Sequence, residues 1–179
     1  MRLKESYKKE IIPKLKEKFG YKNDMEAPKL IKAVVNIGFG RHTKEKAHID
    51  KVVDCLTRIT GQKPILTKAK KSISAFKIRQ GMVIGAAVTL RGARLYDFTE
   101  KLVNITFPRV RDFRGISAKS VDRSGNLTVG FREHLSFPEI KGDEVENILG
   151  LEVCLATNAG SREEGLALFT LMGFPFQKI

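Results

Sequence analysis

The sequence predicts an α+β fold: a two-layer structure with a mainly antiparallel sheet and helices on one face. Two observations predict it. Helical and extended patterns interleave along the chain, and the extended segments between 72 and 91 are joined by loop residues, as in a hairpin, and not by a crossover helix. A length of 179 residues with 42% hydrophobic content predicts a single domain over residues 1–179 with a sizeable core.

Two helices are expected in the first third of the chain. In the first, apolar residues recur four apart, at Leu3, Tyr7, Ile11, Leu15 and Phe19. Pro13 should kink this helix and Gly20 should end it. A second helix should run from a cap at Thr43 to Thr60, with Gly61 at its C-terminal end.

Two further helices are expected later. One covers about 93–106 and is closed by Pro108. The last one begins at the capping box of Ser161 and Glu164 and is ended by Gly173. A long connection rich in arginine and turn residues separates these two helices.

Strands are expected near 30–38, 64–67, 72–78, 85–91, 127–131 and 151–157. In the first strand, Ile31, Ala33, Val35 and Ile37 share one face, whereas Lys32, Val34 and Asn36 share the other. The face of the sheet that the helices leave uncovered would carry Lys32, Asn36, Thr89 and Arg91. An exposed sheet face with polar and basic side chains is a platform on which RNA can bind.

The distribution of charge separates two regions. The net charge is +13, and residues 55–96 contain nine Lys and Arg but no Asp or Glu. A solvated surface usually mixes both signs, so a window of one sign favours a binding face for a polyanion. Residues 133–164 contain eight acids and only two basic residues, which indicates a second kind of partner. Ordinary solvated helix charge is the alternative for these acids.

Enzyme signals are weak. The stretch "NIGFGRHT" lacks the third glycine of a dinucleotide-binding fingerprint, and no phosphate-binding loop is present. Cys55 and Cys154 are expected to be buried, reduced thiols without metal-ligand spacing. We expect no enzyme activity, no cofactor and no metal.

The N-terminus lacks a secretory signal and no apolar run is long enough to cross a bilayer, so an intracellular protein without a membrane partner is expected.

Several stretches together resemble the family of the bacterial large-subunit ribosomal protein number five. They are "VVNIGFG", "ITGQKPILTKAKKSISAFKIRQGMVIG", "VTLRGARLYDF", "FPRVRDFRGIS", "FPEI" and "LMGFPF", in this order over nearly the whole chain. The resemblance implies an α+β fold with a concave, exposed face toward 5S rRNA in the central protuberance. It also implies a cytoplasmic location in the ribosome, contact with P-site tRNA, and a bridge to small-subunit protein thirteen. Large-subunit rRNA and other 5S rRNA-binding ribosomal proteins are further implied partners.

The resemblance assigns residues to each contact. For 5S rRNA it implies the polar residues Asn36, Gln62 and Thr89. From the basic charge around them we add the cations Lys32, Lys63, Lys68, Lys70 and Arg91. For tRNA it implies a protruding basic hairpin at about 70–85, with Lys71, Ser72, Lys77, Arg79, Gln80, Gly81 and Met82. For the intersubunit bridge we expect Arg109, Arg111, Asp143, Glu144 and Glu146.

Alternatives remain open at several of these positions. Asn36 and Thr89 could instead form local hydrogen bonds at strand ends. The hairpin tip, expected at 79–83, should project and be mobile in the free protein, and Met82 could be a latch onto the domain instead of an RNA contact. Val83 stands where the family usually has proline, and "SVDRSGNL" and "TNAGSREEG" also depart from the family pattern. A general nucleic-acid architectural protein and an RNA-modifying enzyme are the competing functions.

Overall fold

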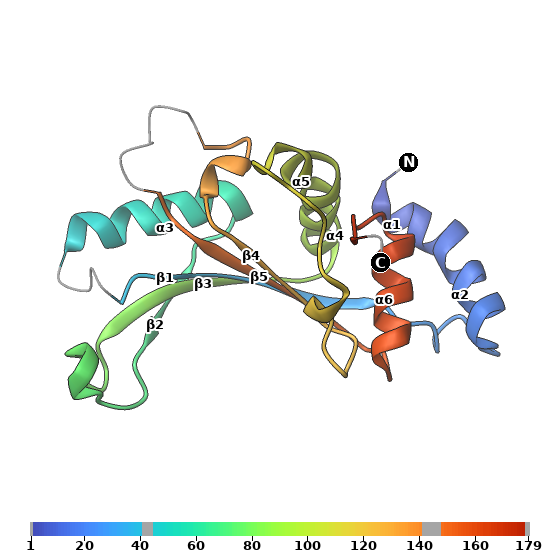
Figure 1. The fold of residues 1–179 in the computed structure, drawn as a ribbon, viewed down its shortest axis with the longest axis horizontal. Helices are drawn as coiled ribbons and strands as arrows, with labels where there is room; N and C mark the ends of the chain where they lie inside the picture. The colour runs from blue at the N-terminus through green and yellow to red at the C-terminus, as the bar shows by residue number, and fades with distance from the viewer. Residues whose placement is uncertain (1, 41–44, 141–147, 178–179) are drawn as a thin grey trace. The chain divides into compact units, whose positions relative to one another are not determined.

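The computed structural model describes residues 2–40, 45–140 and 148–177 (Figure 1). The chain forms two compact units. Unit 1 comprises Met1–Ala33, Leu90–Val129 and Cys154–Ile179. Unit 2 comprises Val34–Thr89 and Gly130–Val153. Each unit is therefore built from separate stretches of the chain.

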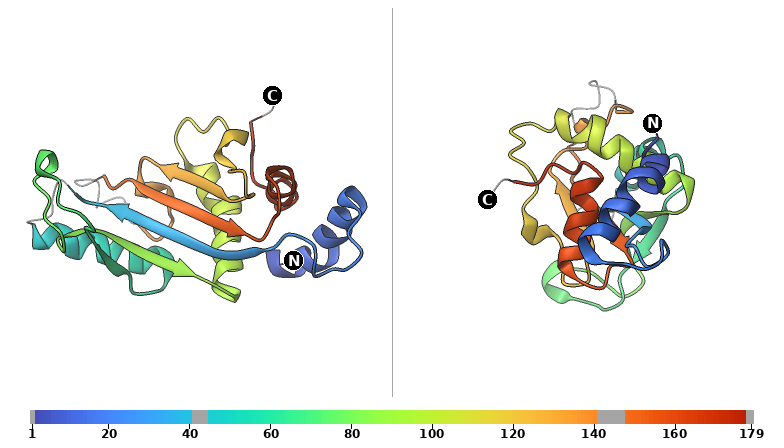
Figure 2. Two further views of the ribbon diagram at one scale, coloured as in Figure 1. Left: turned by 90° about the horizontal axis from the view of Figure 1, so that it is seen from below. Right: turned by 90° about the vertical axis from the view of Figure 1, so that its right-hand side faces the viewer.

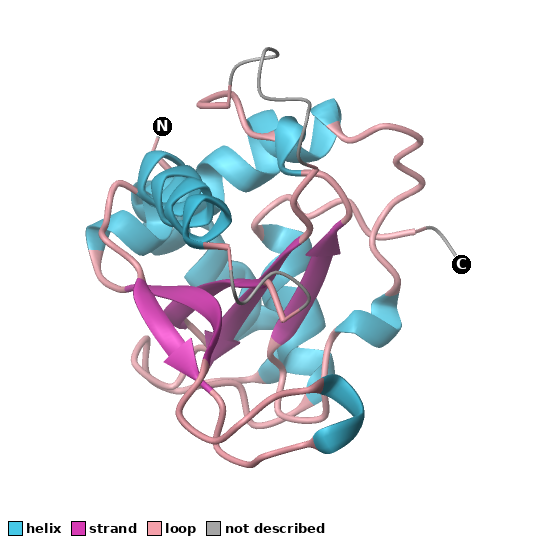
Figure 3. Ribbon diagram, turned by 90° about the vertical axis from the view of Figure 1, so that its left-hand side faces the viewer, coloured by secondary structure: helices cyan, strands magenta, loops and turns pink. Residues whose placement is uncertain are grey.

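The five strands form one sheet in the order β2-β3-β1-β5-β4. They are β1 (Leu30–Gly38), β2 (Ile65–Lys68), β3 (Val83–Leu90), β4 (Leu127–Phe131) and β5 (Leu151–Thr157). Neighbouring strands run in opposite directions, as the arrows in Figure 2 show. With the helices described below, this antiparallel sheet confirms the predicted α+β class (Figure 3).

From Ala33 onward, burial alternates along β1 as its sequence predicts, whereas Ile31, expected on the same face as Ala33, is 42% exposed. Ala33, Val35 and Ile37 are buried, whereas Asn36 and Lys32 on the opposite side are only half-buried. The same alternation holds in β3 and β5. Ala86, Val88 and Leu90 are buried in β3, and Leu151, Val153, Leu155 and Thr157 are buried in β5. We call the side of these strands that faces away from the buried residues the open side. Whether it is concave and binds RNA stays a prediction.

The N-terminal helix continues through Pro13. It consists of α1 (Leu3–Ser6), a π-helical turn (Tyr7–Ile11) and α2 (Ile12–Phe19). In the π turn, the backbone N–H of Ile12 donates to the carbonyl of Tyr7, five residues earlier. This wider turn lies directly before the proline, which has no N–H of its own to donate. The helix ends as predicted at Gly20, which has a left-handed conformation (φ 72°).

A π turn also lies before the proline of the third predicted helix, and the predicted end of this helix is wrong. Here α4 (Ala93–Lys101) leads into a π turn (Leu102–Thr106), and α5 (Phe107–Arg109) follows. The N–H of Phe107 donates to the carbonyl of Leu102, and Pro108 then occupies the first turn of α5. Proline is tolerated in a first turn because that N–H would have no helical partner. The helix is therefore not closed by Pro108 but ends at Arg109.

Unit 2 contains α3 (Lys46–Thr60), which lies along one side of its strands (Figure 1). The sequence pattern predicts that Val52, Val53, Leu56 and Ile59 face inward, and all but Val53, which is only half-buried, are buried. Gly61 ends the helix in a left-handed conformation (φ 66°). The predicted cap at Thr43 lies outside the described residues, and the described helix begins at Lys46.

Unit 1 contains the C-terminal helix α6 (Arg162–Leu171). The predicted cap forms, because the backbone N–H of Glu164 donates to the Ser161 hydroxyl at 3.3 Å. The Glu164 carboxylate accepts from the N–H of Gly160 at 2.7 Å, one residue before the position of an ideal capping box. A residue with positive φ, Gly173 (φ 87°), follows the helix as expected.

The predicted strand at 72–78 is wrong. This segment forms a 3-10 turn (Ser74–Phe76) between Ile73 and Ile78, which are joined to each other as an isolated antiparallel bridge. The strand partner of β3 is β2, with Ile65 opposite Ala87 and Thr67 opposite Gly85. The alternating pattern of 72–78 is short, and a left-handed residue at Lys77 (φ 53°) turns the chain back before a strand can extend.

Candidate nucleic-acid interface

The three polar residues expected to contact 5S rRNA lie in unit 2. Asn36 is half-buried on the open side of β1, and Thr89 is exposed on the open side of β3. Gln62 follows α3 in the turn before β2, and its side-chain amide Nε2 donates to the Thr89 carbonyl oxygen at 3.4 Å. The fold thus brings Gln62 and Thr89 together, although 27 positions separate them in the sequence.

The Asn36 side chain makes no hydrogen bond to any residue in the described part of the chain. An amide carries two donors and one acceptor, so an Asn at this position can pair with a polar partner that approaches from outside. The strand-end alternative for Asn36 has no partner to support it among these residues. The backbone carbonyl of Thr89 accepts a hydrogen bond from the Gln62 side chain. The side chain of Thr89 itself is exposed.

Two small residues, Gly85 and Ala87, lie on the open side of β3. At Gly85 a Cβ atom would lie 2.8 Å from the Thr67 hydroxyl and 3.0 Å from the Ile37 carbonyl oxygen. Only glycine therefore fits between β2 and β1 without a shift. Ala87 is the next residue on the same side, and it is half-buried.

The cations expected to contact 5S rRNA are solvent-accessible. Lys63, Lys68 and Lys70 are exposed in unit 2, while in unit 1 Arg91 is exposed and Lys32 is half-buried. The sequence did not single out Ile65, which is 75% exposed and pairs with Ala87 on the open side. The only feature of the sequence that could have indicated Ile65 as a contact residue is that it is apolar within a basic segment without acids.

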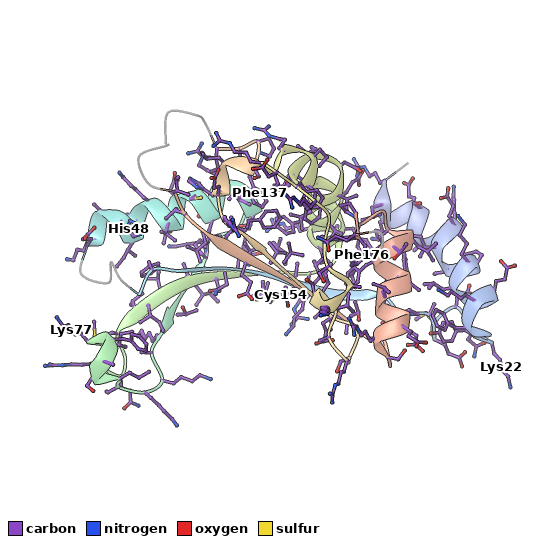
Figure 4. All side chains as sticks on the ribbon, in the orientation of Figure 1. Lys22, His48, Lys77, Phe137, Cys154 and Phe176 are labelled. Carbon is purple, nitrogen blue, oxygen red and sulfur yellow. The ribbon has the colours of Figure 1, made fainter. Side chains whose placement is uncertain are left out.

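The residues expected to contact tRNA lie at the loop that joins β2 to β3. This loop, 69–82, we call the hairpin loop. Lys71, Ser72, Lys77, Arg79, Gln80 and Gly81 are exposed in it, and Met82 is half-buried. Figure 4 shows Lys77 at the far end of the loop, with its side chain directed away from the strands.

The position of the tip needs correction. The sequence predicts that residues 79–83 project, yet they lie at the base of the hairpin loop, beside Ala69. Gly81 N–H donates to the Ala69 carbonyl at 2.9 Å, and Ala69 N–H donates to the Met82 carbonyl at 2.8 Å. The N–H of Gln80 donates to the Ser72 hydroxyl at 2.9 Å. The projecting tip is therefore 73–78, because backbone pairing with Ala69 holds 79–83 against the start of the loop.

The half-buried state of Met82 also has a local cause. Its sulfur accepts from the N–H of Arg79 at 3.1 Å. Met82 thus closes the turn 79–82 from within the loop, and its alternative roles as an RNA contact or as a latch onto the domain stay predictions. Arg79 stays exposed and available to a phosphate.

The proposed bridge residues are described only in part. Arg109 and Arg111 are exposed in unit 1, at the end of α5 and just beyond it. Asp143, Glu144 and Glu146 lie outside the described residues. Nearby in unit 2, the Arg58 guanidinium donates to the Glu139 carbonyl oxygen at 2.6 Å, which fixes the chain before residue 141 to α3.

The two cysteines were both expected to be buried, and this is right for only one of them. Cys55 is buried, but Cys154 is only half-buried, because it alternates with buried residues on the open side of β5. Its sulfur accepts from the Thr128 hydroxyl at 3.6 Å. Within the described residues, no group of three or more His, Cys, Asp or Glu side chains could hold a metal ion. None of the helices described has the length and apolar character needed to cross a membrane.

The fold and charge define a basic α+β protein suited to a polyanionic partner. Residues 23–79 match the family model described as ribosomal protein L5, and residues 83–176 match the model of the C-terminus of the same ribosomal family. The chain therefore belongs to the ribosomal protein L5 (uL5) family, as its motifs indicate.

Curated relatives match the chain over almost its full length. The large ribosomal subunit protein uL5 of Halothermothrix orenii is 53% identical over 98% of each chain. That of Lacticaseibacillus casei is 54% identical over 99% of this chain and 98% of its own. That of Carboxydothermus hydrogenoformans is 52% identical over 99% of each. Members of this family are proteins of the large ribosomal subunit and not enzymes, which confirms the expected class and its place in the ribosome.

Proposed function

We propose that the chain binds 5S rRNA through the open side of β1 and β3 and thereby helps attach it in the central protuberance. The observation that carries this proposal is Asn36. Its side chain alternates with buried residues of β1, and no described residue pairs with it. A half-buried Asn side chain that pairs with no described residue is available to donate and accept hydrogen bonds with another molecule.

The surroundings of Asn36 support RNA as that molecule. Gln62 and Thr89 add hydrogen-bonding groups from two other segments of unit 2, and Lys63 and Lys68 are exposed cations at the ends of β2. Amide and hydroxyl groups can pair with base edges or ribose hydroxyls, whereas lysines neutralise phosphates. Large-subunit rRNA and other 5S rRNA-binding ribosomal proteins would be the neighbours in such an assembly.

The hairpin loop is proposed to contact P-site tRNA. From residue 67 to residue 85 there are five basic residues and no acid, and the described side chains of Lys70, Lys71 and Lys77 are exposed. A carboxylate in this loop would repel a phosphate backbone, and none is present. A loop that extends beyond the paired part of β2 and β3 can reach an RNA other than the one on the open side.

A third contact is proposed with small-subunit protein thirteen, across the subunit interface. Asp143, Glu144 and Glu146 would meet a basic partner there, because complementary charges favour encounter. Arg109 and Arg111 supply exposed charge of the opposite sign. Contacts between exposed charges are individually weak and screened by salt, which suits an interface that moves as the subunits rotate.

The 5S rRNA contact is tested by Asn36→Ala, Gln62→Ala and Thr89→Ala, each measured for 5S rRNA binding by filter retention. Each change should weaken binding by about 1–3 kcal/mol, because a polar group of the RNA is left unpaired. Thermal unfolding should hardly change. Thr170→Ala on α6, whose hydroxyl donates to the Leu166 carbonyl at 2.7 Å, is a matched threonine control outside the proposed surface. Wild-type affinity in all three variants would refute the assignment.

The bridge is tested separately by reversing Asp143, Glu144 and Glu146 to lysine. Such ribosomes should join subunits poorly at low magnesium while retaining 5S rRNA. Normal subunit joining under these conditions would count against the bridge but would leave the RNA contacts untouched.

A further inference from the structure

The tip of the hairpin loop combines positive charge with exposed apolar side chains. Phe76 is 70% exposed and Ile73 is 45% exposed. Phe76 is also the single aromatic residue between positions 55 and 95, in the window that has no acid. Large apolar side chains grouped at a projecting loop mark a site of interaction.

The backbone of the tip holds Phe76 in a defined place. It ends the 3-10 turn Ser74–Phe76, and the next residue, Lys77, donates its N–H to the Ser74 carbonyl at 2.9 Å. Ile73 and Ile78 close the turn with two backbone hydrogen bonds, of 2.9 and 3.1 Å. The aromatic ring is therefore carried by a turn that its own backbone hydrogen bonds close. A preformed contact loses less conformational entropy on binding than a flexible one.

We propose that Phe76 stacks on an unstacked base of an RNA loop, with Lys77 beside it to neutralise a neighbouring phosphate. This inference rests on the proposed function of the hairpin loop and adds the chemistry of the contact. The tip recognises the flat face of a nucleobase, in addition to the phosphate backbone that its lysines attract. Ile73, on the other side of the same turn, offers a second apolar surface to the ribose or the base edge.

An RNA base fits this tip better than a protein side chain does. Single-stranded and loop RNA present unstacked bases next to phosphates, and proteins bind them with aromatic side chains inside basic surfaces. Phe76 lies between Lys70 and Lys71 on one side of the sequence and Lys77 and Arg79 on the other. The absence of any acid in this window also removes the repulsion that a phosphate would meet.

The first test uses the absence of tryptophan from this sequence. Phe76→Trp introduces a single tryptophan whose emission is quenched when a base stacks on it. The full-length variant is titrated with deacylated tRNA and, separately, with 5S rRNA, while filter retention measures binding. Met25→Trp is the control, because Met25 is similarly exposed at 77% but lies in unit 1, outside the loop. Quenching at position 76 and not at position 25 is expected, and the RNA that causes it identifies the source of the base.

The second test measures dissociation of P-site tRNA from ribosomes that carry Phe76→Leu, Phe76→Tyr or Lys77→Gln. Leucine keeps the apolar character but not the ring, so it should speed dissociation about fivefold or more. Tyrosine keeps the ring and should stay close to wild type. Lys77→Gln should also speed dissociation, because a phosphate of the tRNA is then no longer neutralised.

The outcomes separate the two proposals. A faster rate for Lys77→Gln with a wild-type rate for Phe76→Leu would leave the tRNA contact standing and overturn stacking on tRNA. Wild-type rates for all variants, with quenching by 5S rRNA alone, would support stacking and overturn the tRNA contact. Wild-type rates without quenching by either RNA, while binding is intact, would overturn both.

Discussion

Ile73 and Ile78 exchange two backbone hydrogen bonds across the tip of the hairpin loop, with N···O distances of 2.9 and 3.1 Å. This pair closes the turn that carries Phe76 and Lys77. Below it, Ala69 is bonded to Gly81 and Met82. The loop is thus tied at two levels by its own backbone.

The first prediction follows from this pairing. In the free protein, the amides of Ala69, Ile73, Ile78 and Gly81 should exchange with solvent more slowly than the exposed amides of the same loop, because exchange requires their hydrogen bonds to open. Hydrogen exchange followed by NMR measures this directly. Equal and fast exchange over 69–82 would show a loop that orders only against its partner, as the sequence alone predicts for the tip.

The second prediction concerns the lysines of the hairpin loop. Replacing Lys70, Lys71 or Lys77 by Gln should lower the slope of log K against log salt by about 0.7–0.9 for each phosphate that is no longer neutralised. The measurement is RNA binding over a range of salt concentrations. Lys16→Gln is the matched control, because Lys16 already pairs with Asp24 at 2.7 Å in unit 1. An unchanged slope in the loop variants would mean that these lysines face solvent and neutralise no phosphate.

The third prediction concerns two glycines in unit 1. A Cβ atom at Gly165 in α6 would lie 2.4 Å from the Cα of Gly125 and 2.5 Å from its carbonyl oxygen. Alanine normally favours a helix over glycine, but here it would force the backbone of the 122–126 turn away. Gly165→Ala should lower the free energy of unfolding by about 1–3 kcal/mol, as overpacking does.

Urea denaturation measures this effect, with Gly160→Ala as the control. At Gly160 the nearest contact of a Cβ atom would be Glu164 Oε2 at 3.5 Å, an ordinary distance, so this change should have little effect. Equal stability of the Gly165→Ala protein and the wild type would mean that the turn can move without cost.

The fourth prediction is a pH dependence in the same turn. The Asn126 side chain donates to Asp122 Oδ2 at 2.8 Å and its backbone N–H donates to Oδ1 at 2.7 Å. The side-chain bond is the main cause that lowers the pKa of Asp122 from its ordinary value of 3.8. A carboxylate with a lowered pKa in the folded state stabilises the fold above its unfolded pKa, and this contribution is lost as pH falls through the folded pKa.

Asp122→Asn should therefore reduce stability near pH 6 and differ less from the wild type in acid, as pH falls through the lowered pKa of the folded Asp122 and its carboxylate is protonated. Urea midpoints near pH 6 and in acid measure the difference. The opposite trend, with a larger difference in acid, would show that Asp122 does not stabilise the turn as a carboxylate.

Features that depend on neighbouring residues in the sequence were predictable. The alternation of β1 follows from side chains that point to opposite faces, and Gly20 and Gly61 end helices because they adopt positive φ without a steric penalty. The cap at Ser161 likewise depends on a residue only three positions away. Asn36 could also be selected from the sequence, as a polar residue in a strand whose neighbours are apolar.

Other features were decided by contacts between distant segments. The sequence predicts a strand at 72–78, but pairing of β2 with β3 and the bonds of Ala69 to Gly81 and Met82 place a closed turn there. Pro108 predicts a helix end, yet the π turn before it lets the helix continue to Arg109. A short pattern of residues is compatible with several backbone conformations, and tertiary contacts select among them.

The sequence by itself determined the α+β class, the acid-free basic window and membership of the L5 family, because these depend on local periodicity, composition and motifs. Only the tertiary structure decided which residues of that window project. It placed Phe76 at an exposed tip, held 79–82 at the base of the loop, and brought Gln62 to the carbonyl of Thr89. The physical reason is that exposure and long-range hydrogen bonding depend on how the chain returns on itself, which no local pattern contains.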